Sequence, residues 1–336
     1  MYERHRHLAS APEVAASSPS SPGIDGRGSE RPAPVAATSW TQWSCVVRVT
    51  VADRRVLTAA RQIVVALMAD VAAAVSRFTP LSDLSRVNAR AGTITLVSPL
   101  CAQLVGMALD AARTTEGACD PTIGAHLIAA GYDRDFSLIS SGQVEAVPWP
   151  ERSADWQAVV LDPDLDLVGI PKGMALDLGA VAKAWTADEA ARRIHAAFGT
   201  AALVEIGGDL AAVGAPAVPW LIRVAERAGE PGQLVALSHG GLATSTTTRR
   251  RWRRGLQTCH HLIDPRTGRP SEGPWRTASV WASTAAEANA ATTAALVVGS
   301  GAARLLTELG HPARLVGVHG TVVLLGDWPA DQAIAS

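Results

Sequence analysis

One short segment, His260–Pro270, combines side chains that can do chemistry with residues that constrain the backbone. Pro265 and Pro270 fix their own backbone dihedrals and Gly268 permits a positive φ, so we expect a rigid turn. The polar side chains that such a turn would present are His261, Asp264, Arg266 and Thr267. An ordinary surface turn, in which Asp264 and Thr267 bond to their own backbone, fits the same residues equally well.

A single lysine is the second chemical feature. The chain has thirty basic residues, of which only Lys172 and Lys183 are lysine. Lys183 lies among small apolar neighbours in a predicted helix, 174–198, which should end at Gly199. In an arginine-rich sequence this choice indicates a need for a compact ammonium donor, for example to bind phosphate. The alternative is a lysine that extends from a half-buried helix into water.

A third feature is the pair Asn289 and Thr293. Thr284 and Glu287 match a capping box, which predicts a helix that starts at this point and ends at Gly299. Residues four apart share a helix face, so the two oxygen-bearing side chains could meet one hard cation. Polar positions of an alanine-rich helix are the alternative interpretation.

Strands and helices must bring these three features together. The predicted strands and helices are interspersed along the chain without the regular alternation of a doubly wound fold. Hydrophobic periodicity and turn residues predict strands at 44–51, 203–206, 220–224 and 277–283, helices at 56–78, 99–115 and 302–309, and a hairpin at 314–325. We interpret 78–88 as a polar loop, 116–124 as a constrained turn and the arginines of 249–254 as a solvated basic turn. The expected fold class is α+β, with mixed sheets flanked by helices and two lobes that hold the cofactor cleft between them.

Composition limits the function classes. The 336 residues are 48% hydrophobic and carry a formal net charge of −1, which gives no electrostatic signature of nucleic-acid binding. We predict a disordered tail at 1–39, one domain at 40–336, no membrane segment and a cytoplasmic location. Cys45, Cys101, Cys119 and Cys259 form no CxxC pair, so free buried thiols are expected.

Several motifs then occur in an order that resembles the ApbE family of magnesium-dependent FAD:protein FMN transferases. The resemblance covers nearly everything after Trp40. Its pieces are Leu84–Asn88, Gly117–Gly124, Asp177–Lys183, Glu205–Leu210, Ala243–Ser245, His261–Gly268 and Glu287–Gly299. Each piece is short, and it is their common order that makes the resemblance specific.

The resemblance implies an enzyme that transfers FMN from FAD to a Thr or Ser hydroxyl of an acceptor protein through a phosphoester bond and releases AMP. It implies His261 as the general base. FAD contacts are implied for Phe78, Ala118, Cys119, Asp120, Asp177, Lys183 and Ile263. The Mg²⁺ ligands implied are the carbonyl of Ala180 and the side chains of Asn289 and Thr293.

The sequence departs from the family pattern at several positions. Asn289 stands where the family usually has Asp, so one negative charge is missing and weaker Mg²⁺ binding is expected. Ala184 and Thr246 replace usual glycines, and Trp43-Ser44-Cys45 replaces a Met-Gly-Thr motif. Two alternatives to transfer therefore stay open, an FAD-binding protein without transferase activity and a slow FAD pyrophosphatase. The acceptor protein and the oligomeric state cannot be predicted.

Overall fold

An eight-stranded antiparallel sheet forms the centre of the computed structural model, which describes residues 14–15, 35–139, 143–144, 147–151, 153–226 and 232–330. The strand order is β19-β18-β17-β12-β9-β8-β3-β2, and every neighbouring pair is antiparallel. The strands are β2 (Ala36–Gln42), β3 (Cys45–Val51), β8 (Ala202–Ile206), β9 (Asp209–Val213), β12 (Gly240–Thr246), β17 (Trp275–Ala282), β18 (Ala313–Gly317) and β19 (Val322–Leu325).

Smaller sheets lie around this one. One consists of β1 (Val14–Ala15), β10 (Trp220–Val224) and β11 (Gln233–Leu237). Another consists of β4 (Ile94–Leu96), β6 (Val160–Asp162) and β7 (Leu167–Gly169). The others are β5 (Gln143–Val144) with β13 (Arg251–Arg254) and β14 (Gln257–His260), and the hairpin of β15 (Ile263–Asp264) and β16 (Arg269–Pro270). Among the described strands only β5 and β13 pair in parallel.

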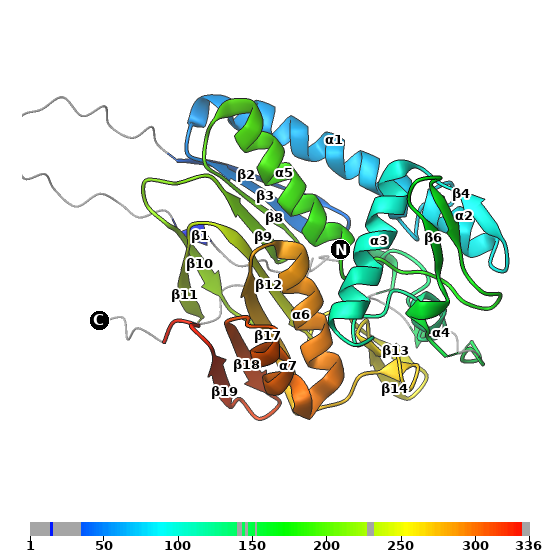
Figure 1. Ribbon diagram of the computed structural model, residues 1–336. Helices are drawn as coiled ribbons and strands as arrows, with labels where there is room; N and C mark the ends of the chain where they lie inside the picture. The colour runs from blue at the N-terminus through cyan, green and yellow to red at the C-terminus, as the bar shows by residue number, and fades with distance from the viewer. Residues whose placement is uncertain are drawn as a thin grey trace, which may run out of the picture.

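Helices cover one face of the large sheet. Figure 1 shows α1, α5 and α6 side by side across this face, with α3 next to them. The helices are α1 (Leu57–Val75), α2 (Asp83–Ala89), α3 (Pro99–Thr114), α4 (Gly124–Ala129), α5 (Ala182–Phe198), α6 (Ala285–Val298) and α7 (Ala302–Glu308). Short 3₁₀ turns occur at Arg54–Val56, Phe136–Leu138, Trp156–Ala158 and Gly299–Gly301.

The alternation of side chains in β8 explains the layers. Val204 and Ile206 belong to the core shared with α1 and α5, whereas Leu203 belongs to a second core with Trp220 and Ile222 of β10. Successive residues of a strand point to opposite faces, so a strand buried on both sides must be apolar at nearly every position. The predicted α+β class with sheets flanked by helices is confirmed. The division into two lobes stays a prediction.

Helix boundaries follow their capping residues. Ser98 accepts from the Cys101 amide at the start of α3, and Thr284 accepts from the Glu287 amide at the start of α6, as predicted. Gly199 ends α5 with a φ of +64°.

Three predicted boundaries were wrong. The predicted loop 78–88 contains helix α2, and the helix predicted from residue 174 begins only at Ala182. The predicted tail 1–39 overlaps β2, which starts at Ala36, and contains β1, which pairs with β10. The rest of the tail up to residue 34 lies outside the described residues.

Two helical stretches are long and apolar enough, by length and composition, to cross a membrane, Arg54–Val75 and Ala285–Glu308. The predicted absence of a membrane segment stays a prediction. Core helices of globular proteins pass the same test, and α1 and α6 both pack against the large sheet.

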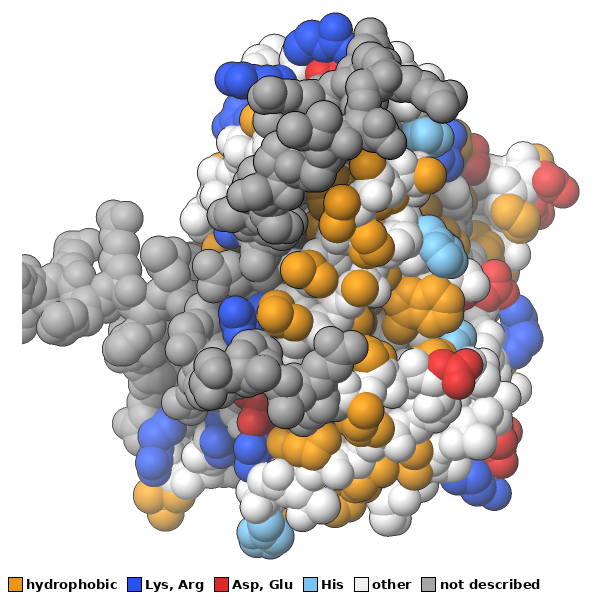
Figure 2. Space-filling model, turned by 90° about the vertical axis from the view of Figure 1, so that its left-hand side faces the viewer, with side chains coloured by type: hydrophobic (Ala, Val, Ile, Leu, Met, Phe, Trp, Pro, Cys, Tyr) orange, Lys and Arg blue, Asp and Glu red, His pale blue; other side chains and the backbone are white. Residues whose placement is uncertain are grey.

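The distribution of surface charge and the state of the cysteines are as the composition predicted. On the face shown in Figure 2, basic and acidic side chains occur in several small groups, so the residues drawn in colour there form no continuous basic surface. All four cysteines are free and buried, as predicted. The cytoplasmic location stays a prediction.

Candidate active site

One cavity of about 980 Å³ brings the predicted site residues together. Its lining includes the predicted base, the predicted flavin contacts and the predicted metal ligands: His261, Phe78, Ala118, Cys119, Asp120, Asp177, Lys183, Ile263, Ala180, Asn289 and Thr293. These residues come from segments that are far apart in the sequence. A volume of this size lies at the upper end of the range for ligand pockets, which suits a large ligand such as a dinucleotide. The individual roles of the residues stay predictions.

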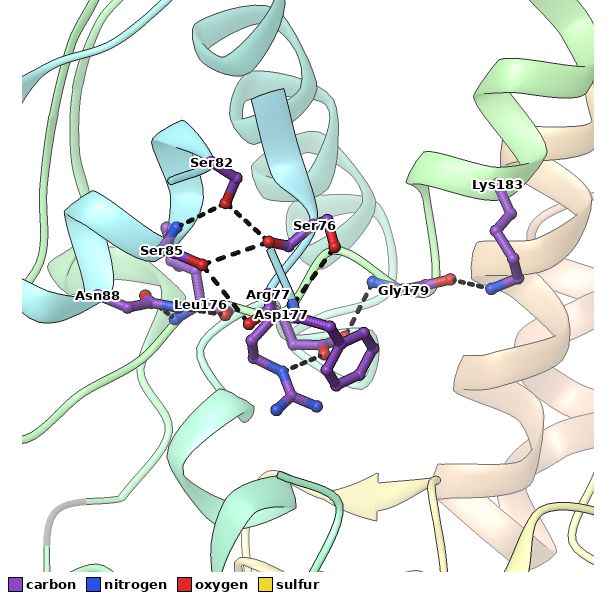
Figure 3. Close-up of polar contacts among 10 residues, drawn as sticks. Ser76, Arg77, Ser82, Ser85, Asn88, Leu176, Asp177, Gly179 and Lys183 are labelled. Atoms are coloured by element: carbon purple, nitrogen blue, oxygen red, sulfur yellow. Dashed lines mark hydrogen bonds and ion pairs between the residues drawn. The ribbon is translucent and has the colours of Figure 1, made fainter. Parts of the chain in front are cut away.

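The loop before α5 is held by several tertiary hydrogen bonds (Figure 3). The Asn88 side chain donates to the Leu176 carbonyl at 3.0 Å and accepts from the Leu176 amide at 2.7 Å. The Asp177 amide donates to the Pro121 carbonyl at 2.8 Å. In a helix from residue 174 the Leu176 carbonyl would accept from the residue-180 amide, but here it accepts from Asn88, so the helix starts later than its composition suggests. The motif that ends in Asn88 therefore positions the motif that begins at Asp177.

Arg77 is the partner of Asp177. Its Nε donates to the Asp177 carboxylate at 2.8 Å, and only 6% of the Arg77 side chain is exposed. Although burial raises the pKa of Asp177, the charge and hydrogen bond of Arg77 outweigh it, so the pKa lies below its usual value. The same carboxylate accepts from the Gly179 amide, and the Gly179 carbonyl accepts from the Lys183 ammonium at 2.8 Å. The loop thus links four polar groups in series.

Aromatic rings form another part of the cavity wall. Phe78 and Tyr132 both line the cavity, and their ring centroids are 5.5 Å apart. The Arg77 guanidinium lies 4.6 Å from the Phe78 ring centroid and 5.4 Å from that of Tyr132. Phe78 is 38% exposed, so part of its ring is open to the cavity. This wall offers π-faces and a cation to a flat ligand.

Cationic groups surround His261. Its Nδ1 is buried and has no hydrogen-bond partner within the described part of the chain. Burial, together with the charges of Arg250 and Lys183, holds the pKa of His261 well below its usual value. The ring is therefore neutral near pH 7, and a neutral imidazole has one nitrogen that can accept a proton. Burial also lowers the pKa of Lys183, and Arg250 adds to this.

Helix α6 brings oxygen ligands to the cavity. Asn289 and Thr293 are one turn apart, and Thr293 Oγ1 donates to Asn289 Oδ1 at 3.4 Å. The Asn289 amide in turn donates to the Asp209 carboxylate. Ala180 packs against Ala290 and Ala294 of the same helix, which places the loop beside it. The shared face predicted for Asn289 and Thr293 is thus confirmed.

The turn at 260–270 divides into two parts. His261 and Ile263 line the cavity, whereas Asp264, Arg266 and Thr267 are absent from its lining. Asp264 accepts from the backbone and side chain of Arg266, and the Gly268 amide donates to the Asp264 carbonyl. His261 and Ile263 thus lie where a site was expected, whereas Asp264 forms the ordinary surface turn that was the alternative interpretation. A Cβ at Gly268 would lie 2.5 Å from the His126 ring, so close packing requires glycine there.

Sequence reasoning missed Arg77, Tyr132 and Arg250. Arg249 and Arg250 line the cavity, although we predicted a solvated turn for their segment. Arg250 has a φ of +45°, which is strained for a residue with a side chain and is common near functional sites. A run of arginines does not show which member turns inward, and Arg77 has no motif of its own.

Known proteins share both the sequence pattern and the fold. A curated relative named FAD:protein FMN transferase from Haemophilus influenzae is 28% identical over 262 residues, which cover 72% of this chain and 73% of the relative. One of the same name from Treponema pallidum is 30% identical over 247 residues, 65% of each chain.

Solved structures of ApbE proteins have the same fold as this chain. The ApbE protein of Thermotoga maritima superposes with a TM-score of 0.78 at 22% identity, covering 87% of this chain and 97% of that one. The flavinyl transferase ApbE of Pseudomonas stutzeri gives 0.75 at 22% identity, covering 89% and 96%. These likenesses establish the fold. The profile of the ApbE family matches residues 41–316, and the chain therefore belongs to the ApbE family.

Proposed function

We propose that this protein transfers FMN from FAD to a Thr or Ser hydroxyl of an acceptor protein, releases AMP and uses Mg²⁺. The observation that carries the proposal is the convergence of the cationic, aromatic and imidazole groups on one cavity. The names of the curated relatives support the same activity.

The proposed reaction has a simple balance. The acceptor oxygen bonds to the phosphorus on the flavin side of FAD, the bond from this phosphorus to the bridging oxygen breaks, and AMP leaves. The hydroxyl proton passes to the neutral imidazole of His261, which lines the cavity. Lys183 and Arg250 offset negative charge on the phosphates, since both are cations that line the cavity. Phe78 and Tyr132 hold the flavin ring.

The oxygen donors in the cavity fit a hard cation. Asn289, Thr293 and the Ala180 carbonyl are uncharged, and Asp209 beside them has a buried carboxylate oxygen without a partner in the described chain. Within the described residues no group of three His, Cys, Asp or Glu side chains could hold a metal, so such a site would depend on these oxygens. When bound there, Mg²⁺ would neutralise charge on the pyrophosphate.

The test combines purified protein, FAD, Mg²⁺ and the acceptor protein of a curated relative. We expect AMP in the supernatant and flavin fluorescence that stays with the acceptor in a denaturing gel, and mass spectrometry should locate FMN on a Thr or Ser. An acceptor in which this residue is replaced by Ala is the control.

Other outcomes would replace the proposal. AMP and free FMN with an unmodified acceptor would indicate a pyrophosphatase. Bound FAD without any AMP, at every Mg²⁺ concentration tried, would indicate a binding protein that does not transfer FMN.

A further inference from the structure

Asp209 has a buried carboxylate whose hydrogen bonding is incomplete. It begins β9 directly after the Gly207–Gly208 turn, and the residue is 2% exposed. One carboxylate oxygen accepts from the Asn289 amide, while Oδ2 has no partner among the described residues. A buried oxygen that lacks a partner costs free energy, so the fold keeps it at the expense of stability.

The surroundings of Asp209 identify the kind of ligand that would satisfy this oxygen. Asp209 lines the cavity together with Asn289, Thr293 and Ala180. The hydrogen bond to Asp209 uses the amide group of Asn289, which leaves the Asn289 carbonyl oxygen on the side of Thr293. The charges of Lys183 and Arg250 act on the Asp209 carboxylate, but neither cation donates a hydrogen bond to Oδ2. The unsatisfied group is thus a carboxylate oxygen beside the neutral oxygens of Asn289 and Thr293, and oxygens of this kind are the ligands that a divalent cation prefers.

We propose that Asp209 is the anionic ligand of the cation site in this chain and supplies the charge that Asn289 lacks. The inference rests on the proposed function only for the identity of the cation as Mg²⁺. A purely structural role is the competing explanation, in which Asp209 orients Asn289 through their hydrogen bond.

Cation binding can be measured without FAD or an acceptor, with Mn²⁺ as the probe. Electron paramagnetic resonance of free Mn²⁺, titrated with metal-free protein, gives the dissociation constant directly. We expect Asp209→Asn to weaken Mn²⁺ binding by about tenfold or more, as the loss of a ligand or of its close support does. The matched control is Asp135→Asn, because Asp135 lines the same cavity but accepts from Ser44 and Ser137. This control should bind Mn²⁺ as the unmodified protein does.

An exchange of the two side chains separates charge from structure. In the double variant Asp209→Asn with Asn289→Asp the pair keeps one carboxylate and one amide, so Mn²⁺ binding should return to within about threefold of the original. Wild-type-like binding by Asp209→Asn, failure of the exchange to restore binding, or no Mn²⁺ binding by the unmodified protein would each overturn the proposal.

Folding is checked by circular dichroism and melting temperature in chelator. We expect Asp209→Asn to melt no lower than the unmodified protein, because it removes a buried charge. Should it fail to fold, Asn289→Asp alone decides: a second carboxylate should tighten Mn²⁺ binding about tenfold, and unchanged affinity would refute the proposal. If the unmodified protein shows no FMN transfer but the Mn²⁺ titrations give the expected results, the proposed function is wrong and the cation site remains. The two failures are therefore distinguishable.

Discussion

His261 illustrates how neighbouring charges can set the chemistry of one side chain. Burial and the cations Arg250 and Lys183 all disfavour the imidazolium form, so the pKa lies well below 6.5. A base must be neutral to accept a proton, and a lowered pKa extends the neutral form toward acid pH. The same cations that would hold phosphates therefore keep the predicted base ready.

The pH dependence of transfer should reflect this environment. Between pH 7 and pH 6 a base with an ordinary imidazole pKa would lose about threefold in rate. We expect kcat/KM for the protein to change by less than about 1.5-fold over that interval and to fall only at lower pH. A threefold loss by pH 6, with folding intact, would show that burial and charge do not act as described.

Replacement of His261 tests its role. His261→Asn should lower the transfer rate by about 10²–10⁴-fold while FAD affinity changes little, since a general base acts on the transition state. The measurements are single-turnover AMP release and flavin fluorescence quenching. The control is His311→Asn, because His311 lies outside the cavity lining. A His261→Asn rate within tenfold of the original would exclude the role of base.

At the residue scale, sequence could predict those positions that lie in ordered motifs. The eleven predicted site residues all line one cavity. Arg77, Tyr132 and Arg250 were missed because their importance comes from where the chain folds back, not from local spacing. Arg77 pairs with Asp177, one hundred residues further along the chain, and nothing near either residue indicates that pair.

Helix α6 is the element on which the proposed cation site depends, and its start is fixed from two sides. The Asp188 carboxylate of α5 accepts from the amides of Ala285 at 2.8 Å and Ala286 at 3.0 Å. A Cβ at Gly241 of β12 would lie 2.0 Å from the Ala285 nitrogen, so the strand contacts the helix end closely. A carboxylate at a helix N-terminus also interacts favourably with the helix dipole.

Loss of the Asp188 carboxylate should destabilise the N-terminal end of α6. Asp188→Ala leaves two buried amides without an acceptor, so we expect a loss of roughly 2–4 kcal/mol in the free energy of unfolding and weaker Mn²⁺ binding. Urea denaturation measures the first effect. The control is Glu287→Gln, because Glu287 is an exposed residue in the first turn of α6, and this change should alter stability by less than about 0.5 kcal/mol. Equal effects of the two substitutions would contradict the role given to Asp188.

At the element scale, prediction succeeded where local signals decide. Thr284 and Gly299 bracket α6 as the capping signals indicated. The helix prediction failed at 174–181. Composition favours a helix there, but the backbone amides of Leu176 and Asp177 donate hydrogen bonds to Asn88 and Pro121 instead. Tertiary hydrogen bonds override helix propensity there, and no window of neighbouring residues contains that information.

Stability of the whole molecule should depend on pH through Glu205. This residue is 1% exposed, and neither carboxylate oxygen has a hydrogen-bond partner among the described residues. Burial raises the pKa of Glu205 to about 8 from 4.5. Between these values the folded chain holds a proton that the unfolded chain has lost, so stability falls as pH rises. Most of the effect is expressed by pH 8.

Glu205→Gln should remove that slope. Between pH 5 and pH 8 the unmodified protein should lose roughly 2–4 kcal/mol more in free energy of unfolding than the variant does. Urea denaturation at each pH measures the difference, in which other titrating groups cancel. Glu226→Gln is the control, because hydrogen bonds from Arg276 hold the pKa of Glu226 below its usual value, outside this interval. Parallel pH profiles for Glu205→Gln and the unmodified protein would show that Glu205 is ionised in the fold.

The predicted boundary between the N-terminal tail and the domain can be tested by truncation. The cavity lining starts at Trp43 and the family match at residue 41, while β2 starts at Ala36 and β1 pairs through only two residues with β10. Removal of residues 1–34 should therefore keep FAD affinity within about threefold and cost about 1 kcal/mol or less in stability.

The contrasting truncation removes residues 1–42 and with them the seven pairs between β2 and β3. It also removes Trp40, which packs against the core under α1, so this protein should unfold or aggregate. Melting temperature and flavin fluorescence quenching measure both variants. A folded protein without residues 1–34 that no longer binds FAD would show that the preceding segment contributes to the site, and the domain would then have to be extended toward residue 1.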